Sequence, residues 1–382
     1  MRFSGFLVFT MLQYAVPAQA DSENKLMSRI DEDPISSPRT RAMGGAAGTV
    51  ADDLDAAFSN PAGIGGLRQK SDAHAPLIRK LYIPAVTAET NAHGPGLIND
   101  LKKSGASGSS AAGQAVFDSH GNQRQYARLN VVTGMVFGRS MVIPFSDSQI
   151  ATTPRGDGSG TIDTNYRNMN GVGYGLSLQN PSGNVSLGYF GYAAARQEIE
   201  GPLQYSEITN RSERSAALRP VSKNYSGAGN NFGGIWRMDY SGSPTLGLNV
   251  KNAGDTAFKA TNGDTLIVKQ EDQASFSLSP RLGQAAVLNF VAQGNRLEEK
   301  KPKANRRYHL GSELLLGKGP GSYSGFALRA GYCDAGGSAG LALHMGIIGL
   351  DLSVYSVDIS PDSSRFVERR ASVMAFLDVA EF

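Results

Sequence analysis

Two glycine-rich stretches of this chain have spacings that occur in catalytic and nucleotide-binding sites. Gly336–Gly340 matches the G-x-S-x-G pattern, in which a nucleophilic serine stands on a sharp turn between a strand and a helix. The residues after Ser338 alternate as a strand does, so we predict a hairpin turn here instead. Gly171–Gly175 resembles the start of a nucleotide-binding loop, but no helix follows and the sixth-position glycine is missing. We expect these glycines to relieve crowding beside bulky neighbours.

Metal and acid–base chemistry also finds little support in the sequence. The five histidines show neither i,i+4 spacing nor a C-x-x-C companion: His74, His93, His120, His309 and His344. Asp52, Asp53 and Asp55 could form a calcium site or a proton-coupled site. We favour a role in solvating their segment and complementing a helix N-terminus, where aspartate is favourable. The sequence therefore predicts no metal site, no cofactor and no enzymatic activity.

The elements that position these residues are short strands. From about residue 75 onward, apolar and polar residues alternate with period 2 between turn signals, a pattern typical of membrane β-barrels. Turns such as Asn180–Gly183 and Ser241–Pro244 supply the residues that tight reversals need. The predicted strands are 75–89, 127–137, 140–152, 162–178, 184–197, 224–240, 244–252, 255–260, 266–280, 285–297, 306–317, 323–333, 338–346, 349–358 and 366–382.

Barrels made from one bacterial chain usually have an even number of strands. We therefore merge 244–260 into one long or bulged strand. The predicted fold is all-β: a membrane-spanning antiparallel β-barrel of about fourteen strands, with twelve as the alternative. A secreted β-solenoid would also suit the composition, which has 46 glycines.

The net charge bears on possible binding partners, and the cysteine content bears on how the fold is stabilised. The net charge of +3 is too small to indicate nucleic-acid binding. Cys333 is the only cysteine, so no intrachain disulfide can form, and stability must come from packing and strand closure.

Residues 41–67 have a composition unlike that of the predicted strands. Small residues dominate the first part, including Gly44 and Gly45, and a short acidic-to-apolar segment follows. Asn60-Pro61-Ala62-Gly63 then enforces a turn, because a proline disfavours helical conformation in the residue before it. Small side chains let backbone pack closely against backbone, which indicates a compact plug.

This stretch resembles the N-terminal segment of the FadL-type outer-membrane transporters and of related barrels associated with conjugal transfer and type IX secretion. The glycine run, Val50–Asp53 and Asn60–Gly63 occur in the order found in that family, just before the first strand. Segments 245–256, 307–313 and 327–331 also look like recurring pieces of the family. The resemblance implies that residues 21–70 plug a barrel formed by residues 71–382. It also implies that Gly44, Gly45, Asn60, Pro61, Ala62 and Gly63 seal or gate the lumen.

Both ends of the chain fit an exported barrel. Residues 1–20 have a positive start, an apolar centre and Ala18-Gln19-Ala20, the order of a cleavable signal peptide. The chain ends on Phe382, and outer-membrane barrels resemble one another in a terminal aromatic residue that the barrel-assembly machinery recognises. Counting back by twos from Phe382 gives a set that includes Asp378, so we expect a bulge near that residue.

The family resemblance implies a passive channel in the bacterial outer membrane for hydrophobic small molecules, such as long-chain fatty acids. Two long loops are predicted near residues 91–125 and 198–223, on the extracellular side. The alternatives are a barrel that docks a secretion or surface-protein partner at these loops, and a structural outer-membrane protein without transport. A phospholipase with Ser353 or Ser372 beside His344 on the outer wall is a weaker alternative, because no spacing supports it.

Overall fold

The computed structural model describes residues 35–67, 80–94, 96, 100, 115–116, 118–209, 213–283, 285–298, 307–317, 324–333, 335–359 and 367–380. The predicted signal peptide (residues 1–20), His74 and the predicted assembly signal Phe382 lie outside the described residues.

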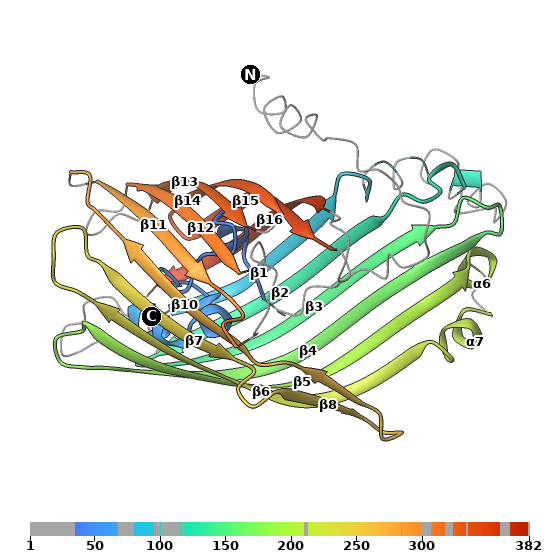
Figure 1. Ribbon diagram of the computed structural model, residues 1–382, viewed down its shortest axis with the longest axis horizontal. Coiled ribbons are helices and arrows are strands. Elements are labelled where there is room, and N and C mark those ends of the chain that lie inside the picture. The colour runs from blue at the N-terminus through green and yellow to red at the C-terminus, as the bar shows by residue number, and fades with distance from the viewer. Residues whose placement is uncertain are drawn as a thin grey trace, which may run out of the picture.

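The described chain folds into one antiparallel sheet that closes on itself (Figure 1). Each strand pairs with its neighbours in the sheet, and the additional pairing of β5 with β6 closes the ring. The strands are β1 (Lys80–Asn91), β2 (Gln125–Phe137), β3 (Ser140–Pro154), β4 (Thr161–Gln179), β5 (Val185–Gln204), β6 (Ser222–Arg237), β7 (Thr245–Lys251), β8 (Thr256–Ala260), β9 (Thr265–Val268), β10 (Glu271–Leu278), β11 (Ala286–Gly294), β12 (Tyr308–Leu316), β13 (Ser324–Cys333), β14 (Gly336–Met345), β15 (Ile348–Asp358) and β16 (Val367–Ala380).

Two pairs of these strands are interrupted halves of longer ones. β7 and β8 both pair with β6, one after the other along its length. β9 pairs with β8 and β10 with β7, so the second half of this hairpin is interrupted in the same way. Positive φ angles at Asn252 (50°), Gly254 (77°) and Asp255 (64°) turn the chain between β7 and β8. The merging of 244–260 is thus confirmed, and the barrel has the fourteen strands predicted.

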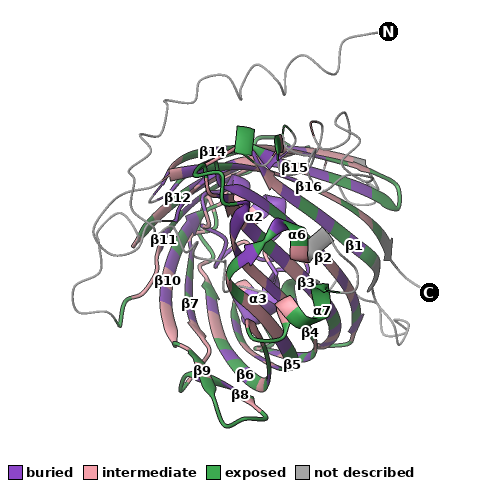
Figure 2. Cartoon of the chain, turned by 90° about the vertical axis from the view of Figure 1, so that its right-hand side faces the viewer, coloured by how far each residue is buried: buried purple, intermediate pink, exposed green. Residues whose placement is uncertain are grey.

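The distribution of apolar and polar side chains over the two faces of the strands is the reverse of that in a water-soluble protein. Large apolar side chains point outward, and Leu187, Leu248 and Leu310 keep 61%, 66% and 54% of their surface exposed. Charged side chains such as those of Arg167 and Glu313 point inward and are fully buried. Figure 2 shows this alternation as stripes along the wall. An apolar exterior with a polar interior is the pattern of a barrel built to lie in lipid.

Connections differ in length between the two ends of the barrel. Short turns join β2 to β3 at residues 138–139 and β14 to β15 at residues 346–347. At the other end, residues 92–124 join β1 to β2, and residues 205–221 join β5 to β6 through the short helices α6 (Tyr205–Thr209) and α7 (Arg214–Leu218). The predicted loop at 198–223 was too long, because residues 198–204 continue β5 and 222–223 begin β6.

The pairing of β16 with β1 does contain a register shift near Asp378, but β16 itself is continuous. The extra residue lies instead in β1 between Ile83 and Val86, opposite Leu377 and Ala375 of β16. Pro84 accounts for this position, because proline has no N–H to give to the ladder.

Residues 35–67, called the N-terminal segment below, lie inside the ring of strands (Figure 2). They form the helical turns α2 (Pro38–Ala42), α3 (Ala56–Ser59) and η1 (Pro61–Leu67). α2 packs against β13–β16, while η1 packs against β4–β6 on the other side of the lumen. In the part of the chain that the structure describes, no helix is long and apolar enough to cross a membrane.

The outward position of Leu328 on β13 provides a test of the reversed faces. Arginine at a lipid-facing position near mid-membrane costs about 2–4 kcal/mol. We therefore expect Leu328→Arg to destabilise the barrel in lipid vesicles, lowering its free energy of unfolding by about 2–4 kcal/mol. Denaturant titration followed by heat-modifiable gel mobility measures it. Leu328→Met is the control, and equal stability of the two variants would contradict the assigned facing.

Candidate functional site

Asn60 ties the N-terminal segment to itself and to the barrel wall. Its side chain is fully buried. The amide Nδ2 donates to the carbonyl of Gly48 at 2.7 Å, and Oδ1 accepts from the backbone N–H of Ala62 at 3.1 Å. The same Nδ2 lies 3.4 Å from the carbonyls of Gly234 in β6 and Leu248 in β7. One side chain thus fixes the turn and holds it against two strands.

The residues that follow touch the wall through backbone. Ser177 of β4 donates its hydroxyl to the carbonyl of Ala62 at 3.1 Å. A Cβ added at Gly188 of β5 would lie 2.1 Å from the nitrogen of Ala62, and one at Gly233 of β6 would lie 2.0 Å from Oδ1 of Asn60. Pro61, Ala62 and Gly63 are all buried there. These inward-facing glycines leave room for the segment.

Gly44 and Gly45 lie apart from that group, against β12 and β13. Both have positive φ angles, 65° and 85°, which glycine adopts without strain. A Cβ at Gly44 would lie 2.8 Å from the backbone of Tyr332. The carbonyl of Gly44 is 2.6 Å from Nδ1 of His309, which must carry a proton to donate. The predicted site residues therefore form two separate groups: Asn60–Gly63 contact β4–β7, whereas Gly44 and Gly45 contact β12 and β13.

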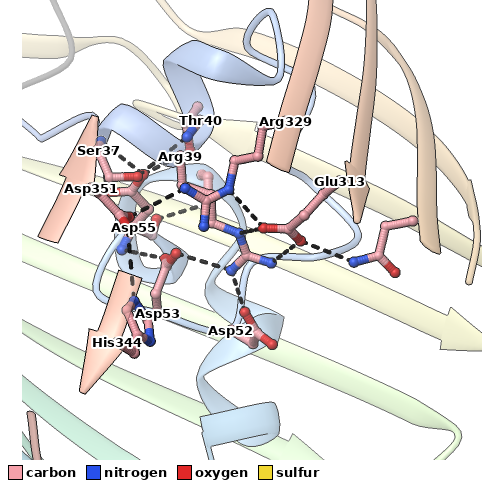
Figure 3. A network of polar contacts seen from close by, with 12 residues as sticks. Ser37, Arg39, Thr40, Asp52, Asp53, Asp55, Glu313, Arg329, His344 and Asp351 are labelled. Carbon is pink, nitrogen blue, oxygen red and sulfur yellow. Dashed lines mark hydrogen bonds and ion pairs between the residues drawn. The ribbon is translucent and has the colours of Figure 1, made fainter. Parts of the chain in front are cut away.

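Arg39 is the main ionic link between the segment and the wall (Figure 3). Its Nε and Nη2 donate to the two carboxylate oxygens of Glu313 in β12 at 2.9 and 2.8 Å. Nη1 contacts Asp52 and donates to Asp53 at 3.1 Å. Bidentate pairing of this kind is both strong and directional.

Glu313 collects further donors from the wall. Arg329 of β13 donates Nε at 2.8 Å, and Asn289 of β11 donates Nδ2 at 3.0 Å. The carboxylate is fully buried, so each donor offsets part of its desolvation. Neither Arg39 nor Glu313 is among the site residues predicted from the sequence. The available signal was a single acidic residue at an inward position of an alternating strand, which requires a buried partner.

Asp55 joins the beginning of the segment to its later part. Its carboxylate accepts from the backbone N–H of Ser37 at 2.8 Å and from the hydroxyl of Thr40 at 2.7 Å. It stands at the N-cap of α3 but makes no side-chain bond to that helix. The predicted complement to a helix N-terminus is therefore replaced by contacts to α2. Among the residues described, no group of three or more potential ligands is placed to hold a metal ion.

Electrostatics set the protonation of the segment's charged groups. Burial and the neighbouring carboxylate of Asp55 raise the pKa of Asp53 from 3.8 to about 6, although Arg39 opposes the shift. Burial alone would lower the pKa of Arg39, but Asp52, Glu313 and Asp53 hold that pKa well above its usual value. Arg39 therefore stays charged, while Asp53 titrates in the range of mildly acidic water.

The lumen has an apolar side and a charged side. On the apolar side, Phe58 of α3 meets Phe190 at 4.7 Å between ring centroids, Phe145 at 5.6 Å and Tyr192 at 5.9 Å. On the charged side, Glu313 of β12 accepts from Arg39 of the segment at 2.8 Å. The segment thus contacts rings with one part and ions with another.

The serines considered for catalysis face the lumen. Ser338 lies in strand β14 and donates to the carbonyl of Ala42 at 2.8 Å, so it belongs to the wall rather than to a strand–helix elbow. It is also not in a turn, because β14 already begins at Gly336, which pairs with Cys333 of β13. Ser353 and Ser372 bond to each other at 2.7 Å and are buried. They do not stand on the outer wall, where the phospholipase alternative placed them.

Comparison with known proteins identifies the fold. No protein-family model matches the sequence, and no curated protein matches it. The toluene transporter TodX of P. putida is 8% identical, with 92% of this chain and 99% of that one covered at a TM-score of 0.50. The toluene transporter TbuX of Ralstonia pickettii is 11% identical, with 92% and 100% covered at a TM-score of 0.52. These likenesses confirm the predicted fold, a closed antiparallel β-barrel, which this chain shares with the two transporters.

Gly233 and Gly234 form a matched pair for testing the contact with Asn60. We expect Gly233→Val to displace residues 60–63, because its side chain would overlap the Asn60 amide. Gly234 points outward, and an added Cβ there would meet only Leu187 at 3.7 Å. Amide hydrogen exchange of residues 56–66 should rise at least about tenfold in Gly233→Val and stay near wild type in Gly234→Val. Equal exchange in the two variants would contradict this contact.

The raised pKa of Asp53 predicts how pH affects docking of the segment. In a released segment the pKa would return towards 3.8, so the docked state binds this proton more tightly. Docking is therefore favoured at pH 4 and weakens as the pH rises to about 6. Amide exchange of residues 51–59, corrected for its intrinsic pH dependence, should increase over this window. Asp53→Asn should remove the dependence, and an unchanged profile in that variant would refute the assignment.

Proposed function

We propose that this protein is an outer-membrane channel through which small hydrophobic molecules diffuse passively, with the N-terminal segment acting as a movable plug. The observation that carries the proposal is the ring-lined apolar side of the lumen, which the segment fills with Phe58. A lumen for ions or sugars would need polar groups along its whole length, whereas an apolar solute needs an apolar surface to enter.

Movement of the plug is consistent with how it is held. Much of its attachment is by hydrogen bonds, such as those from Ser177 and Ser338 to its carbonyls. A hydrogen bond exchanged for water changes the free energy by only about 0.5–1.5 kcal/mol. Water entering the lumen can therefore replace these bonds one at a time while the closed sheet stays intact.

The substrate class is hydrophobic, and two chemistries are candidates within it. Long-chain fatty acids follow from the family resemblance of the sequence. Single-ring hydrocarbons are supported by the likeness to TodX and TbuX, which are toluene transporters. We further propose that residues 1–20 direct export, that Phe382 is recognised during barrel assembly, and that the longer connections face the cell exterior.

Uptake at limiting substrate tests the channel. We expect deletion of the gene to reduce the initial uptake rate of labelled toluene, or of labelled oleate, several-fold, with restoration by the wild-type chain. Phe145→Asn places an amide on the ring-lined side and should lower uptake. Thr87→Asn changes an inward, buried residue of β1 and serves as the control. The channel proposal would be wrong if deletion left the uptake of both substrates unchanged.

A further inference from the structure

The Phe58 ring occupies a cage built from the barrel wall. Phe145 comes from β3, and Phe190 and Tyr192 come from β5. All three wall rings are buried, and Phe58 is 3% exposed. Phe58 meets Phe145 and Phe190 edge-to-face, at interplanar angles of 86° and 63°. These are the geometries that attract aromatic rings to each other beyond simple burial.

Glycines behind the wall rings create the space that Phe58 fills. A Cβ at Gly171 would lie 2.5 Å from Cζ of Phe145, and one at Gly173 would lie 2.1 Å from Cζ of Phe190. On the other side of β5, a Cβ at Gly229 would lie 2.6 Å from Cζ of Tyr192. The rings therefore lie back over bare backbone of β4 and β6. Side chains at these positions would push the rings into the lumen and close the cage.

The hydroxyl of Tyr192, the polar group on the three wall rings, points away from Phe58 towards Asn252. The hydroxyl of Tyr192 donates to Oδ1 of Asn252 at 3.0 Å, which leaves its ring face for apolar contact. When Phe58 leaves, the cage presents three ring surfaces and no unsatisfied hydroxyl. An apolar cavity of this kind stays dry and accepts an apolar molecule of matching shape.

We infer that the cage of Phe145, Phe190 and Tyr192 is a binding site for one neutral aromatic ring, and that Phe58 fills it in the closed state as a tethered competitor. The inference rests on the proposed function and specifies its substrate class. Docking of Phe58 and binding of the ring are mutually exclusive, so the substrate itself favours the released plug by occupying the cage.

The test compares two cavities made within the same segment. Phe58→Ala empties the cage, whereas Met43→Ala empties a fully buried position beside Ala46 and Val291, where no ring lies. Toluene binding to the two purified, refolded full-length variants is measured by calorimetry. We expect toluene to bind Phe58→Ala at least about tenfold more tightly than Met43→Ala, because toluene would make the edge-to-face ring contacts that Phe58 makes in the wild type. Adding Gly173→Ala to Phe58→Ala should weaken binding again, because Phe190 is pushed into the cage.

A second measurement uses the wild-type protein and does not depend on refolding of the variants. Saturating toluene should raise amide exchange at residues 54–59, and methylcyclohexane at equal concentration should raise it much less. Equal binding of toluene by the two Ala variants, or equal effects of the two solvents, would overturn the inference. Toluene or oleate uptake would be unaffected by that result, so failure of the ring site is distinguishable from failure of the channel.

Discussion

Closure of the sheet through the pairing of β5 with β6 is the constraint on which the rest of the structure depends. In lipid, a backbone donor or acceptor without a partner costs several kcal/mol, and a closed barrel leaves no edge along its fourteen strands. Closure also gives every strand one face towards the lumen. Because successive side chains alternate, the apolar set faces lipid and the polar set is confined to a narrow interior.

That interior must then satisfy its own charged groups. Some pair with a residue of the neighbouring strand, as Asp147 of β3 does with Arg128 of β2. Others need the N-terminal segment, and Glu313 is the clearest case, because Arg39 supplies two of its donors. The segment is thus a structural partner of the wall. The segment is held by ions on one side of the lumen and by rings on the other, so in the proposed channel an apolar solute would compete only with the ring contacts.

Glycine makes both attachments possible, by different means. Gly233 and Gly188 face inward and let the segment's backbone approach the wall. Gly171 and Gly173 face inward beside large rings and let those rings lie flat. The stretch that superficially matched a nucleotide loop therefore shapes an apolar surface. Its every-second-residue spacing is the spacing of one face of a strand, which is why three of its glycines share the lumen side.

Much of this fold could be predicted from the sequence because its causes are local. Alternation with period 2 and turn residues such as Gly183 are properties of neighbouring residues, and they placed most strands to within a few residues. Local pattern also justified joining 244–252 to 255–260, and the shared partner β6 confirms it. Three local details were misplaced: the end of β5, which continues to Gln204, the β13–β14 turn, and the bulge, whose extra residue lies in β1 at Pro84.

The contacts that make a site could not be predicted in the same way. Arg39 and Glu313 are 274 positions apart, and Phe58 meets Phe190 across a lumen whose width depends on closure. A slip of one residue would have turned each inward side chain towards lipid. The sequence alone therefore determined the strands, their alternation and the small-residue segment before them. Only the tertiary structure decided which face is the interior and which residues meet there, because barrel closure brings together side chains that no local interaction relates.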